Sequence, residues 1–268
     1  MSRARKIAVV TGASSGIGRA TARALALRGY DLALAARRIE PLEAITAECR
    51  TAGVRALAIP TDVSRRDECE QLIERAEREL GPLDVLVNNA GFAIFDAIER
   101  AGPDDLQSMM ETNYFGTVWC TQAILPAMLS RGRGTIVNVA SIAGIMGYAR
   151  MGGYCATKFA IIGFSEALRD EVLGRGVRVA LVCPGTTNTE FFVKAERGKM
   201  PGASRLILAV SPERVAKAVV AAAEGGQYRR IVPFAAALYM RFKELMPRAA
   251  HFFMRVVSRG MENKKGTP

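Results

Sequence analysis

A tyrosine and a lysine four residues apart, Tyr154 and Lys158, are the residues of this sequence best suited to chemistry, and Ser141 stands 13 residues before the tyrosine. On a helix, positions i and i+4 share one face, so the phenol and the ammonium would lie one above the other. We expect this cation to favour the phenolate and to lower the pKa of Tyr154 below its usual value of about 10. With the Ser141 hydroxyl beside a substrate oxygen, these groups could transfer a proton between an alcohol and a carbonyl. The spacing alone is equally compatible with a solvated helix face.

A glycine-rich segment at residues 11–18, with the sequence TGASSGIG, is the second candidate site. It follows a short apolar run at 7–10 and precedes a helical pattern at 19–27. Glycines let the backbone approach a ligand, and free N–H groups at a helix N-terminus face an anion such as a pyrophosphate. The segment therefore predicts a dinucleotide-binding turn. Its G-x-x-x-G-x-G spacing differs from the common G-x-G-x-x-G, and a tight turn without a ligand is the alternative.

The elements that must position these residues are indicated by apolar runs at 7–10, 31–36, 54–59, 83–87, 135–140, 177–183 and 230–232. The runs alternate with helical patterns along the 268 residues, of which 50% are hydrophobic. Such alternation predicts a doubly wound parallel sheet, covered by helices on both faces, in a single Rossmann-like α/β domain. We assign residues 1–226 to this dinucleotide-binding and catalytic domain and residues 227–268 to a basic amphipathic helical extension.

Several motifs in order along residues 6–225 resemble the short-chain dehydrogenase/reductase family. They are the glycine-rich segment 11–18, Asp62 with Val63, residues 88–91 (NNAG), Asn113, Ser141, Tyr154 with Lys158, and Pro184 with Gly185 followed by Thr189. The resemblance implies an oxidoreductase in which Ser141 holds a carbonyl oxygen and Tyr154 moves the proton. It further implies that Lys158 binds the nicotinamide ribose and that Asn113 helps to hold a water near the lysine.

The resemblance also implies a set of cofactor-binding residues. Besides Tyr154 and Lys158, these are Gly12, Ser14, Ser15, Gly16, Ile17, Gly18, Arg37, Asp62, Val63, Asn89, Ala90, Gly91, Pro184, Gly185 and Thr189. Asp62 would meet the adenine amine, supported by Val63, and Thr189 would contact the nicotinamide carboxamide. Two alternatives stay open, because Asp62 could instead cap a helix beside Ser64 and Thr189 could belong to the cap of the following helix.

Cofactor choice is indicated at the end of the second predicted strand. An NAD enzyme usually carries an acidic side chain there for the ribose 2′-hydroxyl, whereas this chain has Ala36 followed by Arg37. Because the rigid guanidinium fork of arginine matches a phosphate, Arg37 favours NADP. Ser15 occupies a position that is basic in some NADP enzymes of the family, and Arg37 with Arg38 could also be a solvated pair.

We therefore expect an NADP-dependent oxidoreductase that interconverts a carbonyl and a secondary alcohol. Apolar residues at 190–210 and in the C-terminal segment indicate a lipophilic substrate. The resemblance implies a homodimer or homotetramer. The alternative from another class is a nucleotide-sensing regulator on the same fold without turnover, because a fold does not fix a function. The intact set of Ser141, Tyr154, Lys158 and Asn113 favours the enzyme.

Composition limits the remaining possibilities. The five scattered cysteines have no metal-ligand spacing, so we expect a reduced cytoplasmic protein and no metal. No apolar run is long enough to span a membrane. Residues 227–268 hold nine Lys or Arg against two Glu, and their pattern predicts an apolar helix at 234–246 and a basic amphipathic helix after Pro247. Peripheral membrane contact and a lid or oligomer contact both remain open; nucleic-acid binding is not expected, since no recognition module is present.

Overall fold

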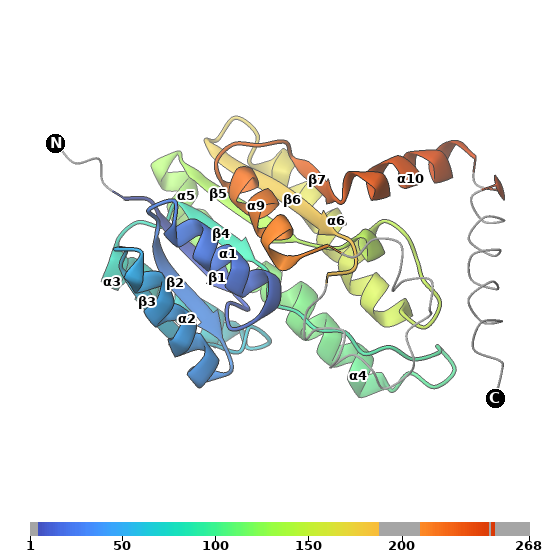
Figure 1. Cartoon of the computed structure of the whole chain (residues 1–268), viewed down its shortest axis with the longest axis horizontal. Coiled ribbons are helices and arrows are strands. Elements are labelled where there is room, and N and C mark those ends of the chain that lie inside the picture. Colours follow the sequence, from blue (N-terminus) through green and yellow to red (C-terminus); the bar gives the residue numbers. More distant parts are fainter. Residues whose placement is uncertain (1–4, 188–209, 247, 250–268) are drawn as a thin grey trace.

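Seven parallel strands form one sheet in the computed structural model, which describes residues 5–187, 210–246 and 248–249 (Figure 1). The spatial order is β3-β2-β1-β4-β5-β6-β7. The strands are β1 (Ile7–Thr11), β2 (Asp31–Ala36), β3 (Ala56–Pro60), β4 (Val85–Asn88), β5 (Gly134–Val139), β6 (Val177–Pro184) and β7 (Arg229–Val232). The predicted doubly wound α/β fold is confirmed, and each strand overlaps one of the apolar runs.

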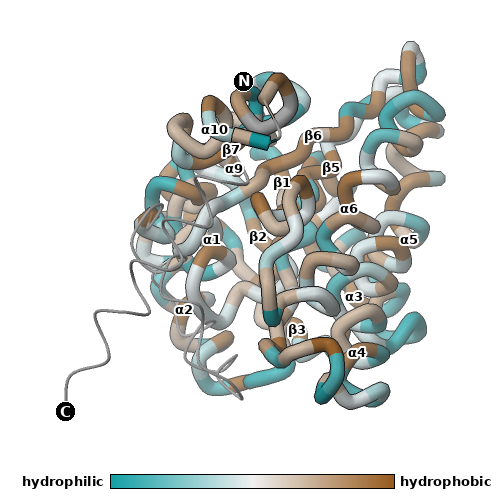
Figure 2. The backbone as a smooth tube through the Cα atoms, turned by 90° about the vertical axis from the view of Figure 1, so that its right-hand side faces the viewer, coloured by the Kyte–Doolittle hydropathy of each residue, from teal (hydrophilic) through white to brown (hydrophobic). Residues whose placement is uncertain are grey.

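Helices cover both faces of this sheet (Figure 1). One layer consists of α1 (Gly16–Ala26), α2 (Ile39–Thr51) and α9 (Pro212–Ala223), in which α1 packs against both other helices and all three share a core cluster. The other consists of α3 (Arg66–Leu80), α5 (Gly116–Arg131) and α6 (Gly152–Glu171). The covering helices carry hydrophilic as well as hydrophobic residues, as expected for elements with one buried and one wet side (Figure 2).

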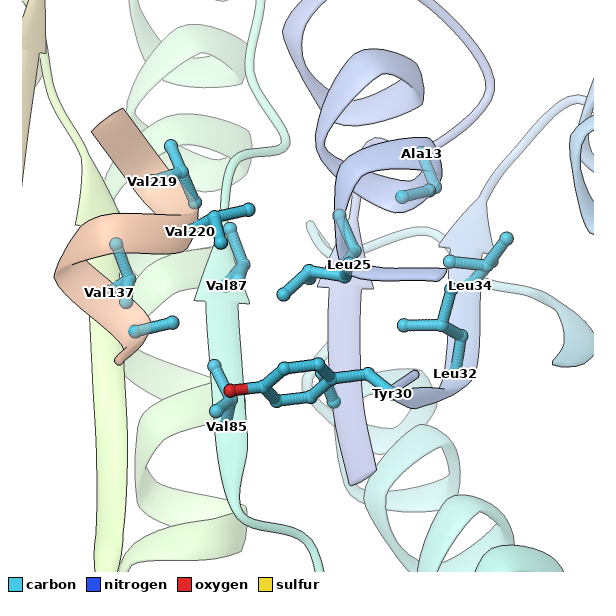
Figure 3. Close-up of a cluster of buried hydrophobic side chains, with 14 of the residues drawn as sticks. Ala13, Leu25, Tyr30, Leu32, Leu34, Val85, Val87, Val137, Val219 and Val220 are labelled. Atoms are coloured by element: carbon cyan, nitrogen blue, oxygen red, sulfur yellow. The ribbon is translucent and has the colours of Figure 1, made fainter. Parts of the chain in front are cut away.

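Two cores result from the alternation of side chains along the strands. Leu34 of β2, Leu25 of α1 and Val219 of α9 all belong to the first core (Figure 3). Ala33, its neighbour in the same strand, belongs to the second core with Leu72 of α3. Since successive strand residues point to opposite faces, an uninterrupted apolar strand supplies both cores at once.

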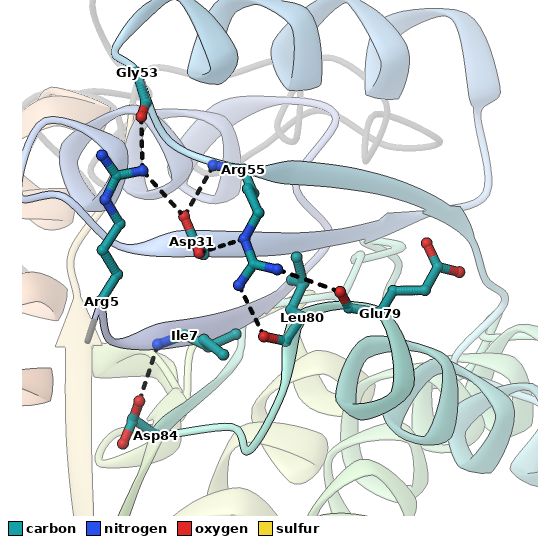
Figure 4. A network of polar contacts seen from close by, with 8 residues as sticks. All are labelled: Arg5, Ile7, Asp31, Gly53, Arg55, Glu79, Leu80 and Asp84. Carbon is teal, nitrogen blue, oxygen red and sulfur yellow. Dashed lines mark hydrogen bonds and ion pairs between the residues drawn. The ribbon is translucent and has the colours of Figure 1, made fainter.

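A buried carboxylate fixes the amino ends of the strands, at the edge of the sheet opposite the candidate site. Asp31 at the start of β2 accepts hydrogen bonds from the backbone N–H of Arg55 at 2.9 Å and from its Nε at 2.7 Å (Figure 4). Arg5 adds an ion pair at 3.7 Å, and Arg55 also donates to the carbonyl of Leu80 at 2.8 Å. These charge-assisted hydrogen bonds and ion pairs compensate the buried carboxylate of Asp31, which would otherwise be costly to remove from water.

Two regions of the fold bear on the site and on the C-terminal extension. Between β4 and β5, α4 (Pro103–Met109) runs through a π-helical turn, η1 (Met110–Phe115), into α5, and a 3₁₀ turn, η2 (Ile142–Gly144), follows β5. β7 pairs with β6, so the sheet continues beyond the expected boundary at residue 226. The predicted helix at 234–246 is present as α10 (Phe234–Leu245), whereas most of the basic helix predicted after Pro247 lies outside the described residues. Within the described ranges, we find no helix with the length and apolarity needed to cross a bilayer.

Candidate active site

The candidate residues gather where the strand order reverses. β1 and β4 are neighbours in the sheet but are not consecutive in the chain, so their following loops diverge to opposite faces. The glycine-rich turn follows β1, residues 89–91 follow β4, Ser141 follows β5 and Gly185 follows β6. Because all the strands are parallel, these segments share the carboxyl edge, where open α/β sheets bind their ligands.

The glycine-rich turn brings the start of α1 close to the end of β1. Gly12 and Gly16 have φ angles of +67° and +53°, a region that favours glycine. A Cβ at Gly18 would lie 2.5 Å from Nδ2 of Asn89 and 2.8 Å from the carbonyl carbon of Gly12, so only glycine lets the helix approach this closely. Ser15 is the N-cap of α1 but its side chain makes no capping bond. The Ser15 side chain therefore does not bond to the first N–H groups of α1, and these groups could bind an anionic ligand.

Two side chains hold the turn against the end of β4. The Thr11 hydroxyl accepts hydrogen bonds from the backbone N–H groups of Asn89 at 3.0 Å and Ala90 at 3.1 Å. In return, the amide of Asn89 donates to the carbonyl groups of Thr11 at 2.9 Å and Gly12 at 3.3 Å. Asn89 therefore shapes the nucleotide turn from the neighbouring strand. Thr11 was not among the predicted site residues, although it begins the glycine-rich motif.

Arg37 lies at the same edge. It directly follows β2 and its side chain is exposed. A hydrogen bond of 3.0 Å from the N–H of Ala13 to the carbonyl of Ala35 joins the glycine-rich turn to the end of β2. Arg37 thus follows a strand end that is bonded to the glycine-rich turn, and its side chain is exposed to solvent.

Asp62 and Val63 take part in local structure. Oδ1 of Asp62 accepts hydrogen bonds from the N–H of Ser64 at 3.0 Å and from its hydroxyl at 2.8 Å, whereas the N-cap of α3 is Arg65 and this helix has no side-chain capping bond. Val63 is buried beneath α5, where a Cβ at Gly116 would lie 2.8 Å from the Val63 carbonyl oxygen. Both residues hold the loop after β3 at the carboxyl edge.

Ser141, Tyr154 and Lys158 come together from β5 and α6. The Tyr154 hydroxyl is hydrogen-bonded to Ser141, and Nζ of Lys158 lies 5.7 Å from the centre of the Tyr154 ring. Lys158 is buried and donates to the carbonyl of Val139 at 3.1 Å. The Ser141 hydroxyl accepts from the N–H of Ala143 at 3.1 Å, which fixes its orientation at the start of η2.

Burial controls the ionisation of this pair. It raises the pKa of Tyr154 above its usual value, and the hydrogen bond with Ser141 lowers it only in part. Burial also lowers the pKa of Lys158 from 10.5 to about 8. The expectation that Lys158 lowers the tyrosine pKa below its usual value is therefore wrong for this structure, because loss of hydration is the largest influence and the contact that lowers the pKa comes from Ser141. At neutral pH the phenol retains its proton.

Asn113 connects the loop after β4 to the helix of Tyr154. It is fully buried in the π-helical turn, where Oδ1 accepts from the N–H of Phe92 at 2.9 Å and Nδ2 donates to the Phe92 carbonyl at 2.9 Å. Nδ2 also donates to the hydroxyl of Thr157 at 3.0 Å, and this hydroxyl donates to the Tyr154 carbonyl at 2.8 Å. Gly91 allows this approach, since a Cβ there would lie 2.9 Å from Oδ1 of Asn113. Thr157 was not among the predicted site residues, although it immediately precedes Lys158.

The end of β6 closes the site on the other side. The Ser141 hydroxyl donates to the carbonyl of Pro184 at 3.4 Å, and the N–H of Gly185 donates to the Val232 carbonyl at 2.6 Å. Thr187 forms an isolated bridge with Val210. Thr189, which we expected to contact the nicotinamide carboxamide, lies outside the described residues. So does most of the apolar stretch at 190–210, which we expected to contact substrate.

An apolar wall surrounds Tyr154. The ring of Phe95, which is fully buried, meets the tyrosine ring edge-on with centroids 6.3 Å apart. Met109, Met151 and Cys155 belong to the same buried cluster. The thiol of Cys155 is directed to the carbonyl of Met146 at 3.9 Å, and all five cysteines are free and buried.

Comparison with known proteins identifies the family. The family model described as short chain dehydrogenase matches residues 6–199. The chain is 36% identical over 220 residues to ketoacyl reductase HetN of Nostoc sp., covering 81% of this chain and 75% of HetN. It is 41% identical over 186 residues to 3-ketodihydrosphingosine reductase of Bacteroides thetaiotaomicron, covering 69% and 65%. It also matches glycine betaine reductase ATRR of Emericella nidulans at 38% identity over 218 residues, 80% of this chain, but spans only 17% of that protein.

Solved structures agree. A short-chain dehydrogenase/reductase from Burkholderia phymatum in complex with NAD superimposes with a TM-score of 0.81 at 27% identity, covering 90% of this chain and 93% of the other. An alcohol dehydrogenase from Thermococcus sibiricus complexed with 5-hydroxy-NADP gives 0.76 at 30% identity, covering 85% and 96%. The neighbours thus include complexes with both kinds of nicotinamide cofactor. The matched family model, the relatives and the fold together assign the chain to the short-chain dehydrogenase/reductase family of oxidoreductases.

Proposed function

We propose that this protein is an NADP(H)-dependent oxidoreductase that interconverts a carbonyl group and a secondary alcohol. The observation that carries the proposal is the buried cluster of Tyr154, Ser141 and Lys158 at the carboxyl edge of the sheet. Only β4 separates β5, which leads to Ser141, from β1, which leads to the glycine-rich turn. A phenol hydrogen-bonded to a serine hydroxyl and lying near a buried ammonium is an arrangement suited to proton transfer at an oxygen atom.

Each side chain has a defined task in the proposed reduction. Ser141, oriented by Ala143, donates a hydrogen bond to the substrate carbonyl oxygen and holds it beside the phenol. Tyr154 then protonates this oxygen as negative charge develops on it, and burial supports this direction because it keeps the phenol protonated at neutral pH. The Lys158 ammonium stabilises the phenolate that remains. Asn113 and Thr157 position the helix turn that carries Tyr154.

The nucleotide would be held by the glycine-rich turn. Its pyrophosphate would meet the N–H groups at the start of α1, and the lack of a side-chain cap at Ser15 fits this role. When bound, NADPH supplies the hydride. The exposed guanidinium of Arg37, which follows β2 where an acidic residue would favour NAD, supports a 2′-phosphate contact. Residues Asp62, Val63, Ala90 and Gly91 would border the adenosine.

We propose a lipophilic carbonyl compound as substrate. The apolar cluster of Phe95, Met109 and Met151 around Tyr154 supports this, as do relatives named ketoacyl and 3-ketodihydrosphingosine reductases. We also propose a homodimer or homotetramer assembled through α5 and α6. Phe115, just before α5, and Phe159 of α6 are exposed aromatic residues that such an interface would cover.

The proposed reaction is tested by following oxidation of NADPH with a panel of fatty-acyl, steroid and sphingoid ketones. We expect turnover with at least one lipophilic ketone, and a loss of about 10²–10⁴-fold in Tyr154→Phe, which removes the acidic proton and keeps the ring. NADPH binding should survive this substitution. Tight NADPH binding by the native protein without turnover of any ketone would support nucleotide sensing instead. Tighter binding of NADH than of NADPH would refute the cofactor assignment.

We further propose that the C-terminal extension contacts a membrane surface. Its nine basic and two acidic residues between 227 and 268 support attraction to anionic headgroups. Co-sedimentation of the native protein with anionic vesicles tests this contact independently of activity.

A further inference from the structure

Five large apolar side chains of α10 and its C-cap point into solvent. Phe234, Leu238 and Leu245 are 77%, 65% and 82% exposed, and Phe242 and Met246 are exposed as well. Positions 234, 238, 242 and 245 recur at intervals of three or four residues and therefore follow one face of the helix. We refer to these five residues as the α10 stripe.

The opposite face of α10 packs on the protein and so fixes which way the stripe points. Ala236 is 1% exposed and forms a small core cluster with Ile142 of η2, against which Tyr148 and Ile231 pack. Figure 1 shows α10 leaving the sheet directly after β7 and extending away from the body of the molecule. The stripe is thus presented outward, while its helix is anchored next to the residue that follows Ser141.

The charges around the stripe indicate the kind of partner. Arg241 is exposed on α10, and Arg248 is exposed just beyond it. Contiguous exposed apolar patches mark interaction sites. A second copy of the same segment would bring like charges together, because residues 227–268 hold nine basic against two acidic residues. An anionic lipid surface instead complements apolar side chains flanked by arginines.

We infer that the α10 stripe is a docking surface for an anionic lipid bilayer. Its phenylalanine and leucine side chains enter the boundary between headgroups and acyl chains, while Arg241 and Arg248 meet the headgroups. This inference rests on the membrane contact proposed above and identifies the surface that makes it. Since α10 packs on Ile142, docking brings the carboxyl edge of the sheet within about one helix diameter, roughly 10–12 Å, of the bilayer. A lipophilic substrate would then reach Tyr154 from the membrane.

The test compares two double variants with equal charge changes. Leu238→Asp with Leu245→Asp alters the stripe, whereas Leu27→Asp with Leu173→Asp alters leucines that are equally exposed on other parts of the molecule. Each protein is sedimented with vesicles of phosphatidylcholine containing phosphatidylglycerol and with vesicles of phosphatidylcholine alone. We expect the native protein and the control to bind the anionic vesicles only. The stripe variant should bind at least about 100-fold more weakly, because each large apolar side chain contributes about tenfold or more.

A charge variant and a lipid-free measurement complete the design. Arg241→Glu should weaken anionic-vesicle binding by about fivefold or more, and added salt should release the native protein. If the native protein did not sediment with anionic vesicles, both the membrane contact and the docking surface would be overturned. Undiminished binding of the stripe variant would overturn the docking surface alone. A change of protomer number in the stripe variant, measured by sedimentation velocity without lipid, would show that a second copy covers the stripe and would also overturn it. Unchanged NADPH binding in all variants confirms that they are folded.

Discussion

Gly18 offers a sharp test of how the nucleotide turn is built, because α1 crosses Gly12 at this residue. A methyl group at position 18 would overlap the carbonyl oxygen of Gly12 and would lie only 2.5 Å from Nδ2 of Asn89, whereas ordinary contact begins near 3.4 Å. The start of α1 must therefore move by about 1 Å in Gly18→Ala. The glycine-rich turn cannot move instead of α1, because hydrogen bonds of Thr11 and Asn89 hold it against the end of β4.

The structure sets the size of the effect. Overpacking of this kind costs about 1–3 kcal/mol, and displacement weakens the two Asn89 hydrogen bonds, worth about 0.5–1.5 kcal/mol each. We expect the free energy of unfolding to fall by about 2–4 kcal/mol and Tm by about 5–15 °C. The shift also withdraws the N–H groups of α1 from an anion, so the Kd of NADPH should rise about tenfold or more.

Gly163→Ala is the matched control. Gly163 is exposed on α6 and a Cβ there has no neighbour within 4 Å, so the substitution should stabilise the protein by about 0.5–1 kcal/mol. Thermal unfolding and fluorescence titration with NADPH measure both variants. If Gly18→Ala unfolded at the native temperature and bound NADPH with native affinity, the close approach of α1 to Gly12 would be refuted.

The remaining predictions concern the cofactor, the proton-transfer site and the amino edge of the sheet. Arg37→Ala should weaken NADPH binding about 10–100-fold and leave NADH binding nearly unchanged; equal losses in parallel titrations would contradict a 2′-phosphate contact. Because the pKa of Lys158 is about 8, kcat/KM for NADPH in reduction should fall as pH rises through about 8, and a flat alkaline limb would contradict the need for its cation. The same group makes the free energy of unfolding rise between about pH 8 and 10.5, where the unfolded chain binds the proton that the folded chain has released. Thr157→Val removes a buried hydroxyl at constant shape and should lower kcat about tenfold or more, with recovery in Thr157→Ser; native kcat in the valine variant would exclude a positioning role. Asp31→Ala should lower the free energy of unfolding in denaturant titrations by about 1.5–3 kcal/mol, with a much smaller loss in the exposed control Asp67→Ala; similar losses would show that burial does not strengthen the Asp31 pairs.

The fold, the glycine-rich turn and the helix that carries Tyr154 and Lys158 could all be predicted from local sequence patterns. Each strand overlaps a short apolar run of the sequence, because a parallel strand covered on both faces is apolar along most of its length. The TGASSGIG turn and the spacing of Tyr154 and Lys158 were equally local signals, since a turn conformation and a helix face depend on neighbours in the chain. The helix at 234–246 also followed from local periodicity, as α10 confirms.

The environment of these residues depends on contacts between distant segments and could not be predicted from local patterns. Whether the pKa of Tyr154 is raised or lowered depends on how completely α6, Phe95 and the loop after β4 exclude water from the phenol. The degree of this burial cannot be inferred from the neighbouring residues in the chain. The roles of Thr11 and Thr157 likewise depend on contacts with Asn89 and Asn113, which are 78 and 44 residues away in the chain. The apolar residues of α10 were visible in the sequence, but their outward direction follows from the packing of Ala236 on Ile142. Local propensity fixes the elements, whereas burial, ionisation and exposure arise from contacts between distant segments, and these exist only once the chain is folded.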